Sequence, residues 1–132
     1  LPGVHRTMRQ LRDAGLKLAI ASSSPPALIE AVVGKLDLAA LLDLTHSGIH
    51  EARGKPDPAV FLTTAEKLGV EPGRCLVFED APAGVSAGKA AGMTVIAVPS
   101  VFEPDDPGIQ AADRVLNSLM EFIDGAAAPH ES

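Results

Sequence analysis

Two adjacent carboxylates, Glu79 and Asp80, stand directly after the apolar run Cys75–Phe78 and shortly before Pro82. The run predicts a short buried strand, and Pro82 suits the first turn of a helix that Gly92 would end. Carboxylates at the end of a buried strand are unfavourable unless a cation lies nearby. Mg²⁺ is the natural candidate, because it prefers carboxylate oxygens and keeps water molecules that a phosphate can replace. The alternative is that one of the two acids only caps the helix.

Two further segments carry side chains suited to phosphate. Ser22 and Ser23 follow the predicted strand 16–21, and Ser24 precedes Pro25 as an expected helix N-cap. Lys55 lies in the polar loop 48–58, where neighbouring glycine and proline restrict its backbone; its ordinary alternative is a solvated surface lysine. A hydroxyl at a helix N-terminus, a lysine and a carboxylate pair together indicate a site for phosphate and Mg²⁺.

Apolar periodicity predicts alternating helices and strands. Helices are expected at residues 4–14, 26–36, 59–68, 82–91 and 118–123, and strands at 16–21, 43–47, 75–78, 94–98 and 114–116. This alternation predicts an α/β fold with a parallel sheet and helices on both faces. Because ligands collect at the carboxyl ends of strands in such sheets, Ser22, Lys55 and the acidic pair are expected to meet at one edge.

Composition narrows the class of protein. The 132 residues are 46% hydrophobic, enough for one domain, and the net charge of 11 − 17 = −6 gives no basic footprint for nucleic acid. No apolar run has the length of a membrane span and no signal peptide is visible, and the single cysteine, Cys75, indicates a packed thiol in a reducing cytoplasm. The histidines lack metal-ligand spacing and are interpreted as ordinary surface or loop residues: His5, His46, His50 and His130.

Three segments, Ile20–Ser24, Gly54–Pro58 and Val77–Val85, resemble motifs two, three and four of the haloacid dehalogenase superfamily. The resemblance covers roughly residues 1–98 and points to the phosphatases and phosphomutases that carry a helical cap. Residues 74–82, 90–93 and 115–119 further resemble phosphatases of pseudouridine 5′-phosphate, hexitol phosphates and 2-deoxyglucose 6-phosphate. A Rossmann-like core, a Mg²⁺ cofactor and a small phosphorylated metabolite as substrate are what this resemblance implies.

The resemblance also implies a role for each matching residue. Ser22 would hydrogen-bond the transferred phosphoryl group, with the amide of Ser23 close by. Lys55 would pair with the phosphate and with the nucleophile, and would stabilise the charge of the transition state. Asp80 would bind Mg²⁺, and Glu79 would bind it directly or through water. Ser22 and Lys55 are thus the expected catalytic residues.

The family's first motif, Asp-x-Asp followed by Gly-Thr, does not occur in the sequence. In the family this motif supplies the nucleophile and the general acid/base, and the cap follows it. The chain is therefore expected to be a C-terminal portion: a partial core at 1–124 and a flexible tail at 125–132, without the cap or the strand between those ending at Ser22 and Asp80. Such a chain is expected to be inactive, and to be unstable unless those two strands pair directly.

For the whole protein, these features predict a cytoplasmic, monomeric, Mg²⁺-dependent phosphomonoesterase acting on a small sugar or nucleoside phosphate through an aspartyl-phosphate. A β-phosphoglucomutase-like isomerase shares the same motifs and remains the alternative enzyme. A non-catalytic binding or regulatory module is the alternative from a different class.

Overall fold

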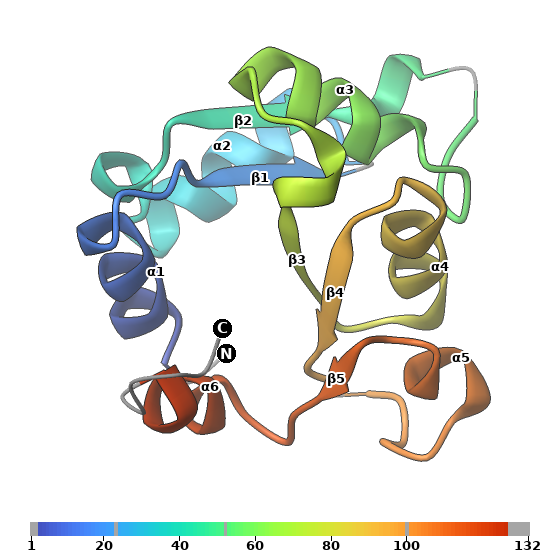
Figure 1. Cartoon of the computed structure of the whole chain (residues 1–132). Coiled ribbons are helices and arrows are strands. Elements are labelled where there is room, and N and C mark those ends of the chain that lie inside the picture. The colour runs from blue at the N-terminus through green and yellow to red at the C-terminus, as the bar shows by residue number, and fades with distance from the viewer. Residues whose placement is uncertain (1–2, 23, 52, 100, 127–132) are drawn as a thin grey trace.

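Two parallel β-sheets form the centre of the molecule (Figure 1). The computed structural model describes residues 3–22, 24–51, 53–99 and 101–126. The first sheet pairs β1 (Ala19–Ser22) with β2 (Leu44–Ser47), and the second has the order β3 (Leu76–Glu79), β4 (Thr94–Ala97), β5 (Arg114–Val115). All three pairings are parallel, so the α/β fold expected from the sequence is confirmed.

Helices separate the strands along the chain, as the periodicity predicts. They are α1 (Val4–Asp13), α2 (Pro26–Lys35), α3 (Ala59–Leu68), α4 (Pro82–Ala90), α5 (Pro107–Gln110) and α6 (Leu119–Ala126), with single 3₁₀ turns η1 (Ala39–Leu41), η2 (Gly48–His50) and η3 (Pro72–Arg74). Helix α3 has the expected bounds, because Gly69 takes the left-handed φ of 71° that ends a helix. None of the helices within the described ranges is long and apolar enough to cross a membrane.

Two elements near the C-terminus differ from expectation. Helix α5 lies between the expected strands 94–98 and 114–116, where no helix is expected, and its first turn is capped by the carboxylate of Asp106, which accepts from the N–H of Gly108 at 2.8 Å. Helix α6 continues to Ala126, so residues 125 and 126 of the expected tail are helical. The remainder of that tail, residues 127–132, lies outside the described residues.

Apolar side chains bury both faces of the second sheet. On one face, a cluster joins β3 and β4 to α3, α4 and α5, and Ala21 of β1 packs against it. On the other face, Phe78 of β3 meets Phe122 of α6 edge to face, with ring centroids 5.1 Å apart. Val4 of α1 packs against this second cluster and also against the cluster beneath the first sheet. Helices α1 and α3 therefore connect the two sheets.

Strands β1 and β3 each form a ladder on one side only. β1 pairs with β2 and β3 pairs with β4, and within the described residues β1 and β3 do not pair with each other. The direct pairing considered from the sequence as a way to close the sheet is therefore wrong for this structure. The place expected for one more strand, between the strands ending at Ser22 and Asp80, coincides with the division between the two sheets.

Candidate active site

An ion pair joins the loop after β2 to the end of β3. The Nζ of Lys55 donates to Oε2 of Glu79 at 2.9 Å, and their side chains are only 19% and 12% exposed. The same ammonium lies 4.9 Å from the ring centroid of Phe61 in α3, a cation–π contact. Two residues 24 positions apart, which the sequence assigns to one site, are thus in direct contact.

The backbone around Glu79 leaves room for its side chain. A Cβ built on Gly84 would lie 1.9 Å from Cδ of Glu79, so the glutamate side chain crosses the first turns of α4 where only glycine fits. Its Oε1 accepts from the N–H of Asp80 at 3.2 Å, and its Oε2 is held by Lys55. Both carboxylate oxygens of Glu79 are therefore held by hydrogen bonds from the protein itself.

Ser22 ends β1 and is half-buried. Its Oγ accepts from the N–H of Ser24 at 3.1 Å, and the Ser24 carbonyl accepts from Oγ of Ser47 at 2.6 Å. The expected N-cap at Ser24 is wrong: the cap position of α2 is Pro25, without a side-chain cap bond. Ser24 instead ties the turn after β1 to β2, and this turn holds the Ser22 hydroxyl at the strand end.

The structure joins only part of the expected site. No hydrogen bond or ion pair connects Ser22 to Lys55 or Glu79 among the described residues, and Ser23 lies outside them. Ser22 instead lines a pocket of about 170 Å³ beside α2, together with Ile20, Ser24, Leu28, Ile29 and Val32.

One carboxylate beside Glu79 is not engaged by another described residue. Asp80 is exposed, and its side chain makes no hydrogen bond or ion pair with another described residue, whereas both oxygens of Glu79 are occupied. The described ranges hold no group of three or more His, Cys, Asp or Glu side chains able to bind a metal. Carboxylate, water and phosphate oxygens suit Mg²⁺, so Asp80 is the side chain available to it and Glu79 lies beside it.

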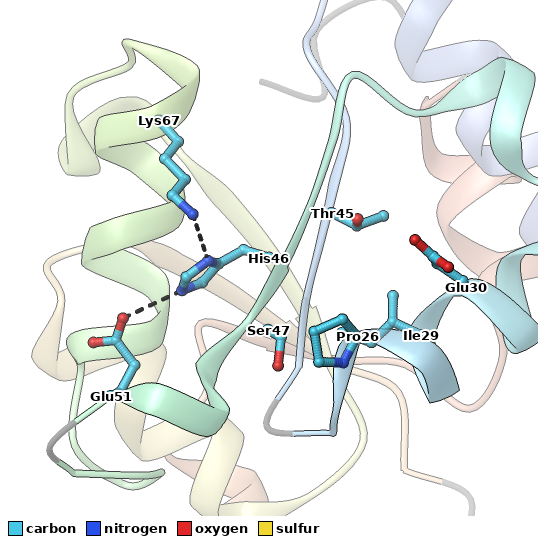
Figure 2. A pocket seen from close by; sticks show the side chains of 8 residues that line it. All are labelled: Pro26, Ile29, Glu30, Thr45, His46, Ser47, Glu51 and Lys67. Carbon is cyan, nitrogen blue, oxygen red and sulfur yellow. Dashed lines mark hydrogen bonds and ion pairs between the residues drawn. The ribbon is translucent and has the colours of Figure 1, made fainter.

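His46 was expected to be an ordinary surface or loop residue, and this is wrong. It lies in β2 with only 7% of its surface exposed. Figure 2 shows its ring between Lys67 of α3 and Glu51, the residue that follows η2, at 3.0 Å from Nδ1 to Nζ and 3.3 Å from Nε2 to Oε1. Its partners Lys67 and Glu51 lie 21 and 5 positions away in the sequence, so no short motif around His46 indicates that it is buried. The closest available signal is the alternation of buried and exposed side chains along β2.

A pocket of about 370 Å³ opens along the outer edge of β2 beside His46 (Figure 2). Its lining comes from α2, β2, α3 and Glu51, and includes Glu30, Thr45 and Lys67. It contains none of the residues expected to bind phosphate or metal. The pair of Lys55 and Glu79, held between buried elements, is therefore the better candidate for the chemistry.

Cys75 has the character expected of a packed thiol. It is free and packs at the border of the largest core cluster, and its Sγ lies 3.5 Å from the Glu71 carbonyl. Burial raises the pKa of the Cys75 thiol. The reactive form, the thiolate, is therefore disfavoured.

A match to a known family gives the class of protein to which this fold belongs. A model of the haloacid dehalogenase-like hydrolases matches residues 1–92, more than half of the chain. The chain belongs to the haloacid dehalogenase-like hydrolase family.

Individual relatives support the same assignment. Hexitol phosphatase B of Escherichia coli K12 is 39% identical over 122 residues, which cover 92% of this chain and 55% of that protein. The β-phosphoglucomutase of Bacillus subtilis is 42% identical over 100 residues, which cover 74% of this chain and 42% of that protein. A solved HAD family hydrolase of Deinococcus radiodurans, with bound phosphate and sodium, superposes with a TM-score of 0.83 at 34% identity, covering 96% of this chain and 58% of that one. The chain spans about half the length of the curated relatives it matches.

Proposed function

We propose that the whole protein is a phosphatase that releases phosphate from a small phosphorylated sugar or nucleoside. The observation that carries this proposal is the half-buried ion pair of Lys55 and Glu79 at the end of β3. Hexitol phosphatase B, a phosphatase by name, aligns over 92% of the chain and supports the substrate class.

Lys55 and Ser22 would act on the phosphate. Glu79 holds the Lys55 ammonium with one carboxylate oxygen, and Phe61 borders it. A lysine fixed in this way needs little reorganisation to stabilise the negative charge that develops on a phosphoryl group. The Ser22 hydroxyl, whose oxygen already accepts from the Ser24 amide, has its own proton free to donate to a phosphate oxygen. The Ser23 amide would be a further donor.

A bound Mg²⁺ would neutralise charge on the phosphate, and Asp80 would hold it, with Glu79 contributing through a water molecule or by direct contact. The nucleophile would come from a strand outside this chain that occupies the space between β1 and β3. That strand would also satisfy the backbone groups on the two open edges. On this proposal, the 132 residues alone bind the phosphate group without turning it over.

A phosphomutase is the second candidate, since the B. subtilis relative bears that name and is 42% identical. The two reactions share the transfer of a phosphoryl group and differ in its final acceptor, which is water in one and a sugar hydroxyl in the other. The described residues hold nothing that selects the acceptor.

The experiment that tests the proposal is to incubate the whole protein with a panel of sugar and nucleoside monophosphates and Mg²⁺. Release of inorganic phosphate supports the phosphatase. Conversion of one sugar phosphate into its isomer, without release, would replace the phosphatase with the mutase. Phosphate binding without either reaction would leave a non-catalytic module as the remaining function.

A further inference from the structure

The loop that carries Lys55 is fastened to the rest of the molecule at three side chains. Between residues 51 and 57, excluding residue 52, side-chain hydrogen bonds leave the loop from Glu51, Lys55 and Asp57. Asp57 accepts from the N–H of Ala59 at 3.0 Å, which fixes the end of the loop at α3. Lys55 is the side chain proposed to act on phosphate. Glu51 is therefore the side chain that holds the N-terminal end of the loop in place.

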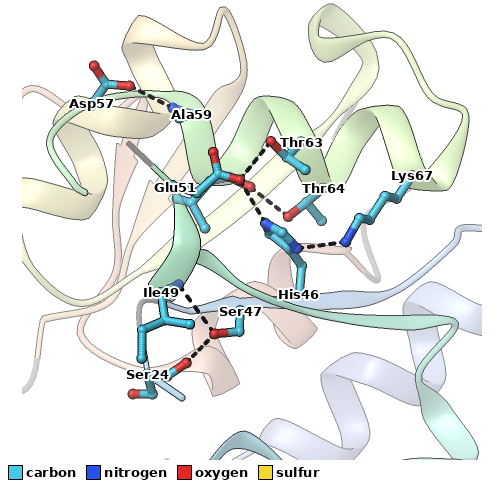
Figure 3. A network of polar contacts seen from close by, with 11 residues as sticks. Ser24, His46, Ser47, Ile49, Glu51, Asp57, Ala59, Thr63, Thr64 and Lys67 are labelled. Atoms are coloured by element: carbon cyan, nitrogen blue, oxygen red, sulfur yellow. Dashed lines mark hydrogen bonds and ion pairs between the residues drawn. The ribbon is translucent and has the colours of Figure 1, made fainter. Parts of the chain in front are cut away.

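Two neighbours hold the carboxylate of Glu51 (Figure 3). Its Oε1 accepts from Oγ1 of Thr63 in α3 at 3.0 Å and lies 3.3 Å from Nε2 of His46. The side chains of Glu51 and His46 are 18% and 8% exposed. Without the His46 donor, the half-buried Glu51 carboxylate would lose one of its two partners and part of its desolvation would be uncompensated, so His46 helps to hold Glu51 in place.

Lys67 determines which nitrogen of His46 carries the proton. Its ammonium has only donors and lies 3.0 Å from Nδ1, so Nδ1 must accept and Nε2 must carry the hydrogen. The Nε2–H then points to the Glu51 carboxylate, which only accepts. The three side chains form one directed chain of hydrogen bonds, from Lys67 through His46 to Glu51.

We infer that His46 is a positioning residue for Lys55: through Glu51 it fixes the entry of the loop, and thereby the place of the Lys55 ammonium beside Glu79. This inference rests on the proposed role of Lys55 in binding and stabilising the phosphoryl group. On this inference His46 acts only through Glu51, without contact to phosphate or metal and without transferring a proton.

The test compares two substitutions of His46 in the whole protein with a matched control. His46→Met keeps the volume but removes the donor to Glu51, whereas His46→Gln keeps an amide N–H close to the position of Nε2. Thr64→Val is the control, because Thr64 is equally buried at 7% exposed and its hydroxyl bonds only the Val60 carbonyl within α3. We expect His46→Met to lower kcat/KM roughly tenfold, from the loss of one hydrogen bond to the half-buried charge of Glu51. His46→Gln should remain within about threefold of the wild type, and Thr64→Val should equal it.

A double-mutant cycle separates positioning from a general structural effect. In a Lys55→Ala background, His46→Met should cause no further loss of kcat/KM, because the group it positions is already absent. An undiminished tenfold loss in that background would overturn the inference, and so would wild-type activity in His46→Met.

A second readout does not depend on activity. The exposed bond between Arg53 and Gly54 lies within the loop, and its cleavage by trypsin in the native whole protein reports how firmly the loop is held. His46→Met should be cut several times faster than the wild type, and Thr64→Val at the wild-type rate. Should the wild type release no phosphate, the proposed function fails, and the cutting rate alone decides the inference: equal rates in His46→Met and wild type would overturn it.

Discussion

The side chain of Glu79 occupies the space in which a Cβ at position 84 would lie. The ideal Cβ of a residue at Gly84 falls 1.9 Å from Cδ and 2.2 Å from Oε1 of Glu79. Gly84 lies within α4 and has no left-handed φ, so its backbone does not require glycine. What requires glycine is the carboxylate that crosses the helix to reach Lys55.

Gly84→Ala should therefore separate Glu79 from Lys55. A methyl group would displace the glutamate, the ammonium would lose its partner, and we expect turnover by the whole protein to fall on the order of tenfold to 100-fold. Gly34→Ala is the matched control, because Gly34 is also a helical glycine and a Cβ there meets nothing within 4 Å. That substitution should raise stability by up to about 1 kcal/mol without changing turnover. Phosphate release and thermal unfolding measure both effects, and full activity in Gly84→Ala would contradict the assignment.

Lys55→Ala should remove transition-state stabilisation. We expect turnover to fall by about 100-fold or more with the fold retained, the usual effect of deleting one preorganised charge-stabilising group. Lys35→Ala, at the exposed end of α2, controls for the loss of one positive charge. Steady-state kinetics at saturating Mg²⁺ gives the result. A loss below about threefold would mean that the pair with Glu79 is structural only.

Asp80→Asn should weaken the response to Mg²⁺. Asp80 is the carboxylate at the site whose oxygens are not already engaged by another described residue, and an amide is a weaker ligand for this ion. The rise in thermal unfolding temperature on adding Mg²⁺, which measures binding without catalysis, should shrink or vanish, and activity at limiting Mg²⁺ should fall severely. Asp105→Asn, in an exposed loop, is the control. An unaltered Mg²⁺ dependence would leave Asp80 without a metal-binding role.

Asp113 should make stability depend on acidic pH. The Lys89 ammonium at 2.9 Å and the Val95 N–H at 2.7 Å hold the pKa of the Asp113 carboxyl below its ordinary value. A pKa that is lower in the folded state stabilises the fold above the unfolded pKa of about 3.9, and this contribution is lost as pH falls through the folded pKa. The difference in unfolding temperature between wild type and Asp113→Asn should therefore be constant near neutrality and disappear in acid. A difference that does not shrink as the pH falls below the unfolded pKa of about 3.9 would contradict the assigned cause.

Local signals in the sequence predict most of the elements. Gly69 ends α3 where expected, since its left-handed φ is a property of the residue itself. The shared-edge argument also predicts that Lys55 and Glu79 meet, and they do, although the loop of Lys55 follows β2 of one sheet and Glu79 ends β3 of the other. The paired acids correctly indicate a nearby cation, yet the cation that the structure supplies to Glu79 is the Lys55 ammonium. The place of Mg²⁺ beside Asp80 stays a prediction.

Other features depend on partners that no local pattern reveals. The burial of His46 requires Lys67 and Glu51 to reach it from two other elements. Ser24 resembles a helix cap in sequence, but its backbone is taken by contacts with Ser22 and Ser47. His46 and Ser24 are residue types that are common on protein surfaces. Their actual positions depend on contacts with residues of other elements.

The separate ladders of β1–β2 and β3–β4–β5 have a consequence for how the molecule opens. No strand pairing couples the two sheets within the described residues, and packed side chains, among them those of α1 and α3, join them. Backbone ladders open cooperatively, whereas such side-chain junctions can part while each ladder survives. Native-state hydrogen exchange is therefore expected to resolve two cooperative units, with the slowest amides in β4, the strand paired on both sides. A strand inserted between β1 and β3 would merge these two units into one.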